Sequence, residues 1–228
     1  MKPRWHIYPD TNDLVDHTIS AITRIANHAI IKHGAFHLVL AGGSTPKIVY
    51  ERLRDASTRW SAWHIYFGDE RCLPANDLER NSVMAFDALL HHVPIPAQQI
   101  HVIPAELGPE AGSRAYAKTI EGISRFDLVL LGLGEDGHTA SLFPGNNWGV
   151  GMKSDAALAV YNSPKLPKER ITLSVHRFNT AEQVIFLVTG LSKQNAIADW
   201  FGGKLLPAAS ITPVNGVDVF MEAICFPS

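Results

Sequence analysis

The chain is poor in cysteine, in clustered charge and in long apolar runs, and each scarcity argues against a class of protein. Its 228 residues include two cysteines, Cys72 and Cys225, which give neither a disulfide framework nor the paired spacing of a zinc site. The formal net charge is −2 without any basic block, which argues against nucleic acid as a partner. No apolar run approaches the ~20 residues that span a bilayer, so we expect no membrane association.

The first residues, MKPRWHIYPD, lack the apolar core of a secretory signal peptide. Together with the isolated cysteines, this start predicts a cytoplasmic protein. Hydrophobic residues make up 46% of the chain and charged residues 18%, as is typical of a soluble protein with a sizeable core. At this length we expect one domain over residues 1–228, and nothing indicates an obligate protein partner.

Apolar runs alternate with helical patterns along the chain. The expected strands are 5–8, 36–41, 63–67, 100–103, 126–131, 157–161, 171–175, 183–189 and 217–223, the last at a sheet edge. The expected helices are 12–33, which Gly34 is placed to cap, 46–54, 82–92, 109–122 and 194–201. This alternation predicts an α/β fold with a mostly parallel sheet covered on both faces.

The most informative segment is FDLVLLGLGEDGHTASLFPG, residues 126–145. Its apolar start predicts a strand buried on both faces, and ligands of open α/β sheets lie beyond the carboxyl ends of such strands. His138 and the nearby Asp136 follow that end. An imidazole activates water near neutral pH, and a carboxylate fixes its tautomer. The segment therefore predicts a soluble enzyme with a water-based, non-covalent reaction.

The same segment suggests two other readings that the residues do not favour. Gly132, Gly134 and Gly137 match the dinucleotide-binding spacing, but that motif opens a long helix, whereas Pro144 breaks the chain soon afterwards. Ser141 suggests a serine hydrolase, yet the G-x-S-x-G pattern is absent. No H-E-x-x-H motif or cysteine pair indicates a metal site.

A second polar segment, AGGSTP, follows the strand expected at 36–41. Gly42 and Gly43 let the backbone approach a ligand closely. Thr45 before a proline is a typical N-cap, and Ser44 adds a hydroxyl at the same helix start. A helix N-terminus binds anions, so the segment indicates phosphate binding, although an ordinary capped turn has the same sequence.

A third polar segment, GDERCLPANDLERNS, follows the strand at 63–67. Arg71 suits planar recognition of a phosphate or carboxylate, and Asp69 is placed to orient it or to bind sugar hydroxyls. A surface ion pair is the alternative, and Asn81 is either a ligand contact or a helix cap. Arg170 and Lys193, which flank later strands, add candidate cations that alternatively lie free in solvent.

Taken together, these segments resemble the 6-phosphogluconolactonase family, the lactonases of the oxidative pentose phosphate pathway. The matching pieces are LAGGSTPKIVYERL, WHIYFGDERCLP, LLGLGEDGHTASLFPG, PKERITLS and VTGLSK, in the family's order from residue 40 to residue 193. The related glucosamine-6-phosphate deaminases continue their Gly-His loop toward I-A-F-N-E-P-G. Residues 139–144 read TASLFP instead, which favours the lactonase.

The resemblance implies a single Rossmann-like α/β/α sandwich, as in glucosamine-6-phosphate deaminase and ribose-5-phosphate isomerase. It implies hydrolysis of 6-phospho-D-glucono-1,5-lactone to 6-phosphogluconate without cofactor or metal. His138 would be the general base and Asp136 its orienting group. The residues that would bind the substrate and its phosphate are Gly42, Gly43, Ser44, Thr45, Asp69, Arg71, Asn81, Arg170 and Lys193.

Two places depart from the family pattern. Glu79 and Arg80 precede Asn81 where the family more often has a small or acidic residue followed by serine, which puts the role of Asn81 in doubt. Glu222 stands where the family often has aspartate. The oxyanion stabiliser stays open between backbone N–H groups of the glycine loop and Arg71. The competing functions are a sugar-phosphate isomerase or deaminase and a non-catalytic sugar-phosphate sensor.

Overall fold

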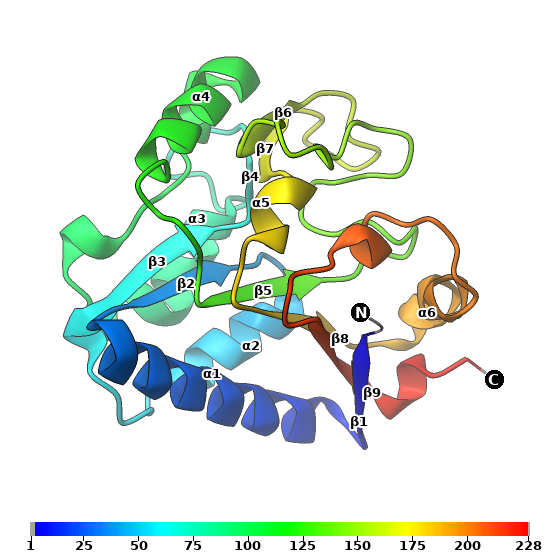
Figure 1. Cartoon of the computed structure of the whole chain (residues 1–228), viewed down its shortest axis with the longest axis horizontal. Coiled ribbons are helices and arrows are strands. Elements are labelled where there is room, and N and C mark those ends of the chain that lie inside the picture. The colour runs from blue at the N-terminus through cyan, green and yellow to red at the C-terminus, as the bar shows by residue number, and fades with distance from the viewer. Residues whose placement is uncertain (1–2, 228) are drawn as a thin grey trace.

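A computed structural model of the chain describes residues 3–227 and shows a six-stranded sheet with helices on both faces (Figure 1). The strand order is β1-β9-β8-β5-β2-β3, and every neighbouring pair is parallel. The strands are β1 (Arg4–Tyr8), β2 (Phe36–Leu40), β3 (Trp63–Phe67), β5 (Leu128–Gly132), β8 (Gln183–Val188) and β9 (Val217–Glu222). Because all six run the same way, their carboxyl ends meet at one edge of the sheet.

The helices lie on the two faces of this sheet. Below it in Figure 1 are α1 (Thr11–His33) and α2 (Ser44–Leu53). The others are α3 (Asn81–Ala85), α4 (Pro109–Thr119), α5 (Val175–Asn179) and α6 (Gln194–Phe201). Single turns of other helix types occur at Phe86–Leu90, Trp60–Ala62, Ala97–Gln99, Ala105–Leu107, Leu191–Lys193, Ala208–Ser210 and Ala223–Cys225. Among residues 3–227, no helix has the length and apolar character of a membrane span.

Local chemistry accounts for the two ends of α1. The Asp10 carboxylate accepts hydrogen bonds from the backbone N–H groups of Asn12 and Asp13, at 2.8 and 3.0 Å. Gly34 ends the helix with a φ of 88°, a left-handed conformation that glycine adopts without strain. The predicted limits of this helix are therefore confirmed to within one residue.

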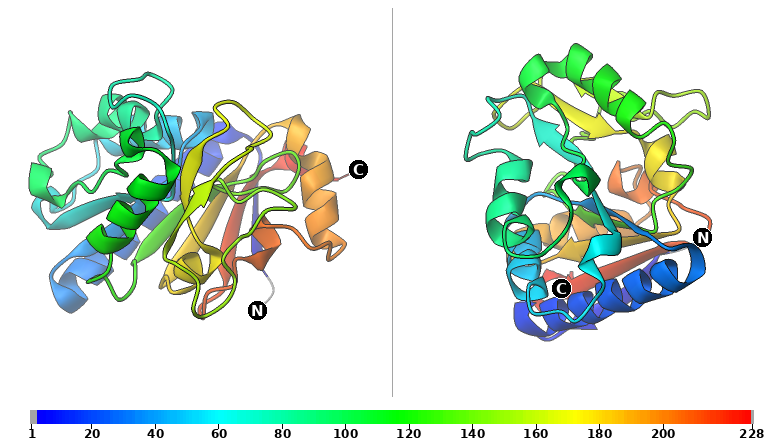
Figure 2. Two further views of the ribbon diagram at one scale, coloured as in Figure 1. Left: turned by 90° about the horizontal axis from the view of Figure 1, so that it is seen from above. Right: turned by 90° about the vertical axis from the view of Figure 1, so that its left-hand side faces the viewer.

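The central strands are buried on both faces, as the apolar runs predict. Residues 128–131 of β5 and 184–188 of β8 are all buried. Such strands need a helical or sheet layer on each side, and in Figure 2 the second layer includes α4 together with a smaller sheet. The expected α/β class and mostly parallel sheet are confirmed.

The smaller sheet was not expected. It has the order β4-β7-β6, is antiparallel, and consists of β4 (Asp69–Arg71), β6 (Ala157–Val160) and β7 (Arg170–Leu173). Residues 69–71, expected as a loop, pair with β7 so that Arg71 lies opposite Arg170. Three residues are too few to show an alternating pattern, and their partner strand lies far away in the sequence.

Four further expectations were wrong in detail. Segment 100–103 forms a single bridge, Ile65 to Ile100, and no strand. Strand β9 lies between β1 and β8 and is not at the edge. The helix expected at 82–92 ends its regular α part at Ala85 and closes with a wider turn. Helix α2 begins at Ser44, two residues before the proline that was expected to start it.

Histidine rings from four segments form a stack beside β2 and β3. The ring of His37 lies 4.9 Å from that of His64, which lies 6.0 Å from that of His101. His33 stacks on the other side of His37 at 6.4 Å. The Nδ1 atom of His37 is 3.2 Å from the Tyr66 hydroxyl. Several imidazoles are thus placed where their protonation is mutually unfavourable.

These neighbours and its burial lower the pKa of His37. Burial lowers its pKa to about 4, and the neighbouring His64, His33 and His101 act in the same direction, against the opposing charge of Asp127. The folded state therefore favours neutral His37, while the unfolded chain takes up its proton near pH 6.5. The stabilisation is complete above that pH and is lost as the pH falls toward about 4.

We expect His37→Gln to flatten the acid side of the stability profile. The free energy of unfolding of the wild type should fall between about pH 6.5 and about pH 4, and the variant should fall less steeply. Urea titrations at a series of pH values measure this slope. The exposed His91→Gln serves as the control and should keep the wild-type slope. An unchanged slope in His37→Gln would contradict the assignment.

Candidate active site

A cavity of about 310 Å³ opens where the carboxyl ends of β2, β3 and β5 meet the small sheet. Its lining includes eight of the eleven residues singled out from the sequence. They are Gly42, Gly43, Asp69, Arg71, Asn81, His138, Arg170 and Lys193. Asp136 contacts His138 from outside the lining, and Ser44 and Thr45 do not line the cavity. The parallel sheet therefore brings together side chains that are up to 151 positions apart.

His138 and Asp136 form a hydrogen-bonded pair. The Asp136 Oδ1 atom lies 2.5 Å from His138 Nδ1 and also accepts the His138 backbone N–H at 3.1 Å. An ionised carboxylate only accepts hydrogen bonds, so Nδ1 carries the proton and Nε2 is left with a free lone pair. No other described side chain contacts Nε2 through a hydrogen bond, and the ring lines the cavity. This nitrogen is positioned to accept a proton from water.

The glycine loop holds this ring in place. A Cβ on Gly134 would lie 1.9 Å from His138 Nδ1, so no other residue fits there without moving the imidazole. The Gly134 N–H donates to the His138 carbonyl at 2.7 Å, and the Thr139 hydroxyl donates to the Gly132 carbonyl at 2.8 Å. The ring packs against Phe143, with centroids 4.7 Å apart. Gly134 thus allows the imidazole to pack closely against the loop backbone.

Burial and the mutual hydrogen bond shift the pKa values of His138 and Asp136 in opposite directions. Burial lowers the pKa of His138, and the hydrogen bond and charge of Asp136 raise it without reversing that direction. Burial acts to raise the pKa of Asp136, but its hydrogen bonds from His138 hold that pKa below its ordinary value. At neutral pH the imidazole is therefore uncharged and the carboxylate ionised. This is the state that a general base requires.

A second carboxylate, Asp69, is buried in the lining of the same cavity. Its Oδ2 accepts the Ser141 hydroxyl at 2.6 Å, and its Oδ1 accepts the Asn81 side-chain amide at 3.1 Å. Burial raises the pKa of Asp69, against the lowering effects of Ser141 and Arg170. Ser141 is itself buried and committed to this bond, which agrees with the absence of a nucleophile motif. Asn81 contacts Asp69 and does not cap its helix.

Glu70 organises the loop that carries these residues, a role that the sequence did not reveal. Its fully buried carboxylate accepts backbone N–H groups from Arg71, Asn81 and Ser82 at 2.9, 2.7 and 2.8 Å. The Nε atom of buried Arg80 lies 3.4 Å away as its counterion. The amino end of α3 is therefore occupied by a side chain of the protein and not available to a ligand.

Four cationic side chains line the cavity, and they differ in how many of their hydrogen-bond donors already have partners within the protein. Arg71 donates from Nη1 to the Glu79 carbonyl and keeps a buried Nε without a partner among the described residues. Arg170 is bound by the carbonyls of residues 165–167 and fixes that loop. Lys193 and Lys165 line the cavity without a hydrogen-bonded partner in the described chain. Lys165 was missed because a lysine between prolines carries no motif.

The AGGSTP segment departs from its expected capping pattern. Gly43 is the N-cap of α2, and no side chain caps that helix start. The Thr45 hydroxyl lies 2.6 Å from the Thr189 hydroxyl, at the end of β8, so Thr45 joins two loops and caps nothing. A Cβ on Gly42 would lie 2.0 Å from Asn81 Oδ1. Glycine at this position therefore permits the contact between the two cavity walls.

The described residues hold no group of three histidine, cysteine or acidic side chains arranged for a metal ion. What the cavity presents is a neutral imidazole with an ionised partner, a buried carboxylate, and several cations. A parallel sheet with this set of groups at its carboxyl edge defines a Rossmann-like α/β protein with a candidate active site at the position where such folds bind their ligands.

The chain belongs to the family of glucosamine-6-phosphate isomerases and 6-phosphogluconolactonase, whose sequence profile matches residues 9–220. It is 35% identical over 228 residues to the 6-phosphogluconolactonase of Mycobacterium leprae, covering 92% of this chain and 90% of that one. It is 36% identical to the GDH/6PGL endoplasmic bifunctional protein of Oryctolagus cuniculus, covering 92% of this chain but only 28% of that protein.

The fold is also similar to a solved structure. The crystal structure of 6-phosphogluconolactonase from Thermotoga maritima superimposes with a TM-score of 0.89 at 28% identity, covering 97% of this chain and all of that one. The family resemblance read from the sequence motifs and the Rossmann-like fold that it implied are both confirmed.

Replacing Asp136 with asparagine should lower the pKa of His138 further. Asp136 raises that pKa by its hydrogen bond and its charge, so removing the charge leaves burial less opposed. The titration of the His138 ring, followed by NMR on protein with ¹³C-labelled histidine, measures the shift. Glu135→Gln removes the neighbouring exposed carboxylate and is the control, with no change expected. A His138 pKa that rises or stays constant in Asp136→Asn would refute the pairing.

Proposed function

We propose that this protein hydrolyses 6-phospho-D-glucono-1,5-lactone to 6-phosphogluconate, the lactonase step of the oxidative pentose phosphate pathway. The observation that carries the proposal is the His138–Asp136 pair, with Nε2 free, in a cavity faced by cations. The relatives named 6-phosphogluconolactonase at 35% identity over nearly their whole length support the choice of substrate.

The chemistry needs one base and a positioned water. His138 Nε2 takes a proton from water as the water oxygen bonds to the lactone C1 carbonyl, which becomes a tetrahedral oxyanion. The oxyanion then re-forms the carbonyl, the bond from C1 to the ring oxygen breaks, and the imidazolium returns its proton to that oxygen. Asp136 keeps Nδ1 protonated and stabilises the transient imidazolium. General base catalysis of this kind contributes about 10²–10⁴-fold in rate.

The phosphate is anchored on the cationic side of the cavity. Arg71 offers its unpartnered Nε, and Lys193 and Lys165 add charge, while Arg170 acts mainly by holding the 165–167 loop. The uncapped start of α2 supplies backbone N–H groups near Gly42, Gly43, Ser44 and Thr45. This binding energy, remote from C1, orients the ring toward the base.

The remaining cavity groups suit the sugar hydroxyls. Asp69 and Asn81 present a carboxylate and an amide that are already fixed by hydrogen bonds to Ser141 and to each other. We further propose that the chain acts as one domain, since a single apolar cluster runs from α1 to Cys225. Its place of action is taken to be the cytoplasm, and nucleic acid and obligate protein partners are not part of the proposal.

We expect His138→Ala to reduce kcat by at least about a hundredfold, because the proton acceptor is removed. Glucose 6-phosphate is oxidised in situ, and disappearance of the lactone is followed with and without the protein. His91→Ala, an exposed histidine far from the site, should keep wild-type turnover. Near-normal turnover in a folded His138→Ala protein would exclude this residue as the base.

The same preparations separate the lactonase from its alternatives. Release of ammonia from glucosamine 6-phosphate, with no acceleration of lactone hydrolysis, would identify a deaminase of the same family. Binding of sugar phosphates without turnover of either would identify a sensor. Acceleration of lactone hydrolysis that is lost in His138→Ala excludes both.

Arg71→Ala should raise KM for the phosphorylated lactone by about tenfold or more, with a smaller effect on kcat, since a charged hydrogen bond to phosphate is lost. Hydrolysis of D-glucono-1,5-lactone, which lacks the phosphate, should be nearly the same in variant and wild type. Arg114→Ala on exposed α4 is the matched control. Equal losses on both lactones would show that Arg71 acts on the sugar ring or on folding and not on the phosphate.

A further inference from the structure

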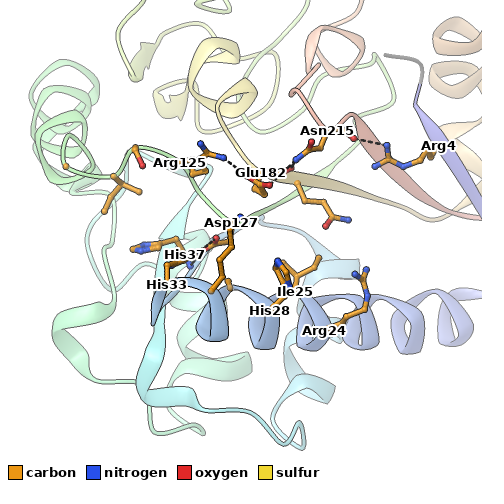
Figure 3. A pocket seen from close by; sticks show the side chains of 16 residues that line it. Arg4, Arg24, Ile25, His28, His33, His37, Arg125, Asp127, Glu182 and Asn215 are labelled. Atoms are coloured by element: carbon orange, nitrogen blue, oxygen red, sulfur yellow. Dashed lines mark hydrogen bonds and ion pairs between the residues drawn. The ribbon is translucent and has the colours of Figure 1, made fainter.

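A second and larger cavity, of about 730 Å³, lies at the opposite edge of the sheet (Figure 3). Its floor is formed by the amino ends of the strands: Arg4 begins β1, Asp127 precedes β5, and Gln183 begins β8. One wall is the second half of α1, and the other is the turn at 122–125. Ligand pockets commonly have volumes of ~300–1,000 Å³. This cavity is remote from the carboxyl edge that carries His138.

Positive charge predominates around this cavity. Its lining contains Arg4, Arg24, Lys32 and Arg125 against the two carboxylates of Asp127 and Glu182. The whole chain, by contrast, carries a formal net charge of −2. An excess of cations in a concave site, in a protein that is acidic overall, focuses a positive potential there.

Both carboxylates of the cavity already form ion pairs or hydrogen bonds with other residues of its lining. Glu182 accepts from Arg125 at 2.6 Å, and Asp127 accepts from His33 at 2.9 Å. Arg4 is neutralised from outside the lining by Asp218, at 2.7 Å. Arg24 and Lys32 line the cavity and form no ion pair within 4.0 Å among the described residues, although Lys32 acts on Glu182 from farther away.

Both cations line the cavity from α1, where Arg24, His28 and Lys32 follow one another at intervals of four residues. Figure 3 shows Arg24 and His28 on this helix. Residues at this spacing lie on one face of a helix, so Arg24 and Lys32 are two turns apart on the same face, with His28 between them. The helix dipole favours a cation in the last turn, which accounts for Lys32. It does not account for Arg24, which lies in the middle of α1. An anion bound in the cavity would compensate both.

The cavity also has a flat, uncharged part. Ile25 and Ala29 of α1 are buried where they line it, and the rings of His33 and His37 also line it, with His33 at the end of the imidazole stack. Aromatic and apolar surfaces of this kind suit the face of a heterocyclic base or a similar planar group. The Ser124 hydroxyl and the Asn215 amide add hydrogen-bonding groups on the far wall.

From this geometry we propose that the cavity at the amino edge of the sheet is a second, non-catalytic binding site for a phosphorylated polyanionic metabolite of nucleotide size. Its phosphates contact Arg24 and Lys32, and its planar part lies against Ile25 and the imidazole of His33. The site is independent of the lactonase proposal, because it shares no lining residue with the cavity of His138.

Adenosine 5′-diphosphate is a suitable probe because it combines a planar base with a diphosphate. Calorimetric titration of the full chain should give saturable one-to-one binding that weakens as salt is added. NMR should place the largest shifts at the amides of Ser124 and Arg125. The Arg24→Ala/Lys32→Ala variant should bind at least about tenfold more weakly, with unchanged kcat and KM on the lactone.

Two controls make the result decisive. Arg114→Ala/Lys118→Ala removes the same charge from exposed positions on α4 and should bind the probe as the wild type does. Arg71→Ala should also bind it normally. Loss of binding in Arg71→Ala, with retention in Arg24→Ala/Lys32→Ala, would place the probe in the catalytic cavity and overturn the proposal. Absence of saturable binding by the wild type, or equal binding by all variants, would overturn it as well.

Discussion

The buried carboxylate of Glu70 is the contact on which the catalytic cavity depends. It accepts three backbone N–H groups, from Arg71, Asn81 and Ser82, and has Arg80 as its counterion. A buried donor left without an acceptor costs about 1–3 kcal/mol, so this single side chain stabilises a loop that otherwise has little apolar content. Its removal would also leave the buried guanidinium of Arg80 with only Glu106 as an acid. The position of Asp69, Arg71 and Asn81 around the cavity follows from this one carboxylate.

The main sheet determines where the loops that line the cavity lie. Parallel strands deliver all their following loops to one edge, and the antiparallel β4-β7-β6 sheet closes over that edge from the side. Arg71 and Arg170, paired across β4 and β7, are like charges placed opposite each other. Such a pair is unfavourable by itself. It persists because Asp69 lies near both and because Arg170 is bound by three carbonyl interactions of the adjoining loop.

The sequence was sufficient for the features that depend on local signals. Buried runs predicted β5 and β8, Gly34 marked the end of α1, and the polar segments after three strands indicated which side chains share a cavity. The features that it did not predict depend on distant partners. The strand at 69–71 exists only because β7 pairs with it, and the bond from Thr45 to Thr189 replaces a cap that local sequence favours. The role of Glu70 was not predicted because its partners are mostly backbone N–H groups, which have no sequence signature.

The cations that we propose to bind the phosphate also affect the protonation of the proposed base, His138. His138 has to be uncharged to accept a proton, yet Asp136 beside it favours the charged form. Burial lowers the pKa of His138, and the nearby cation Lys165 lowers it further. A site that collects cations for a phosphate therefore also keeps its histidine neutral. In the mechanism that we propose, the substrate's phosphate would offset part of that positive charge, and the imidazole would become a stronger base once the lactone is in place. In this proposal, one set of cationic side chains both attracts the substrate and controls the proton affinity of the base.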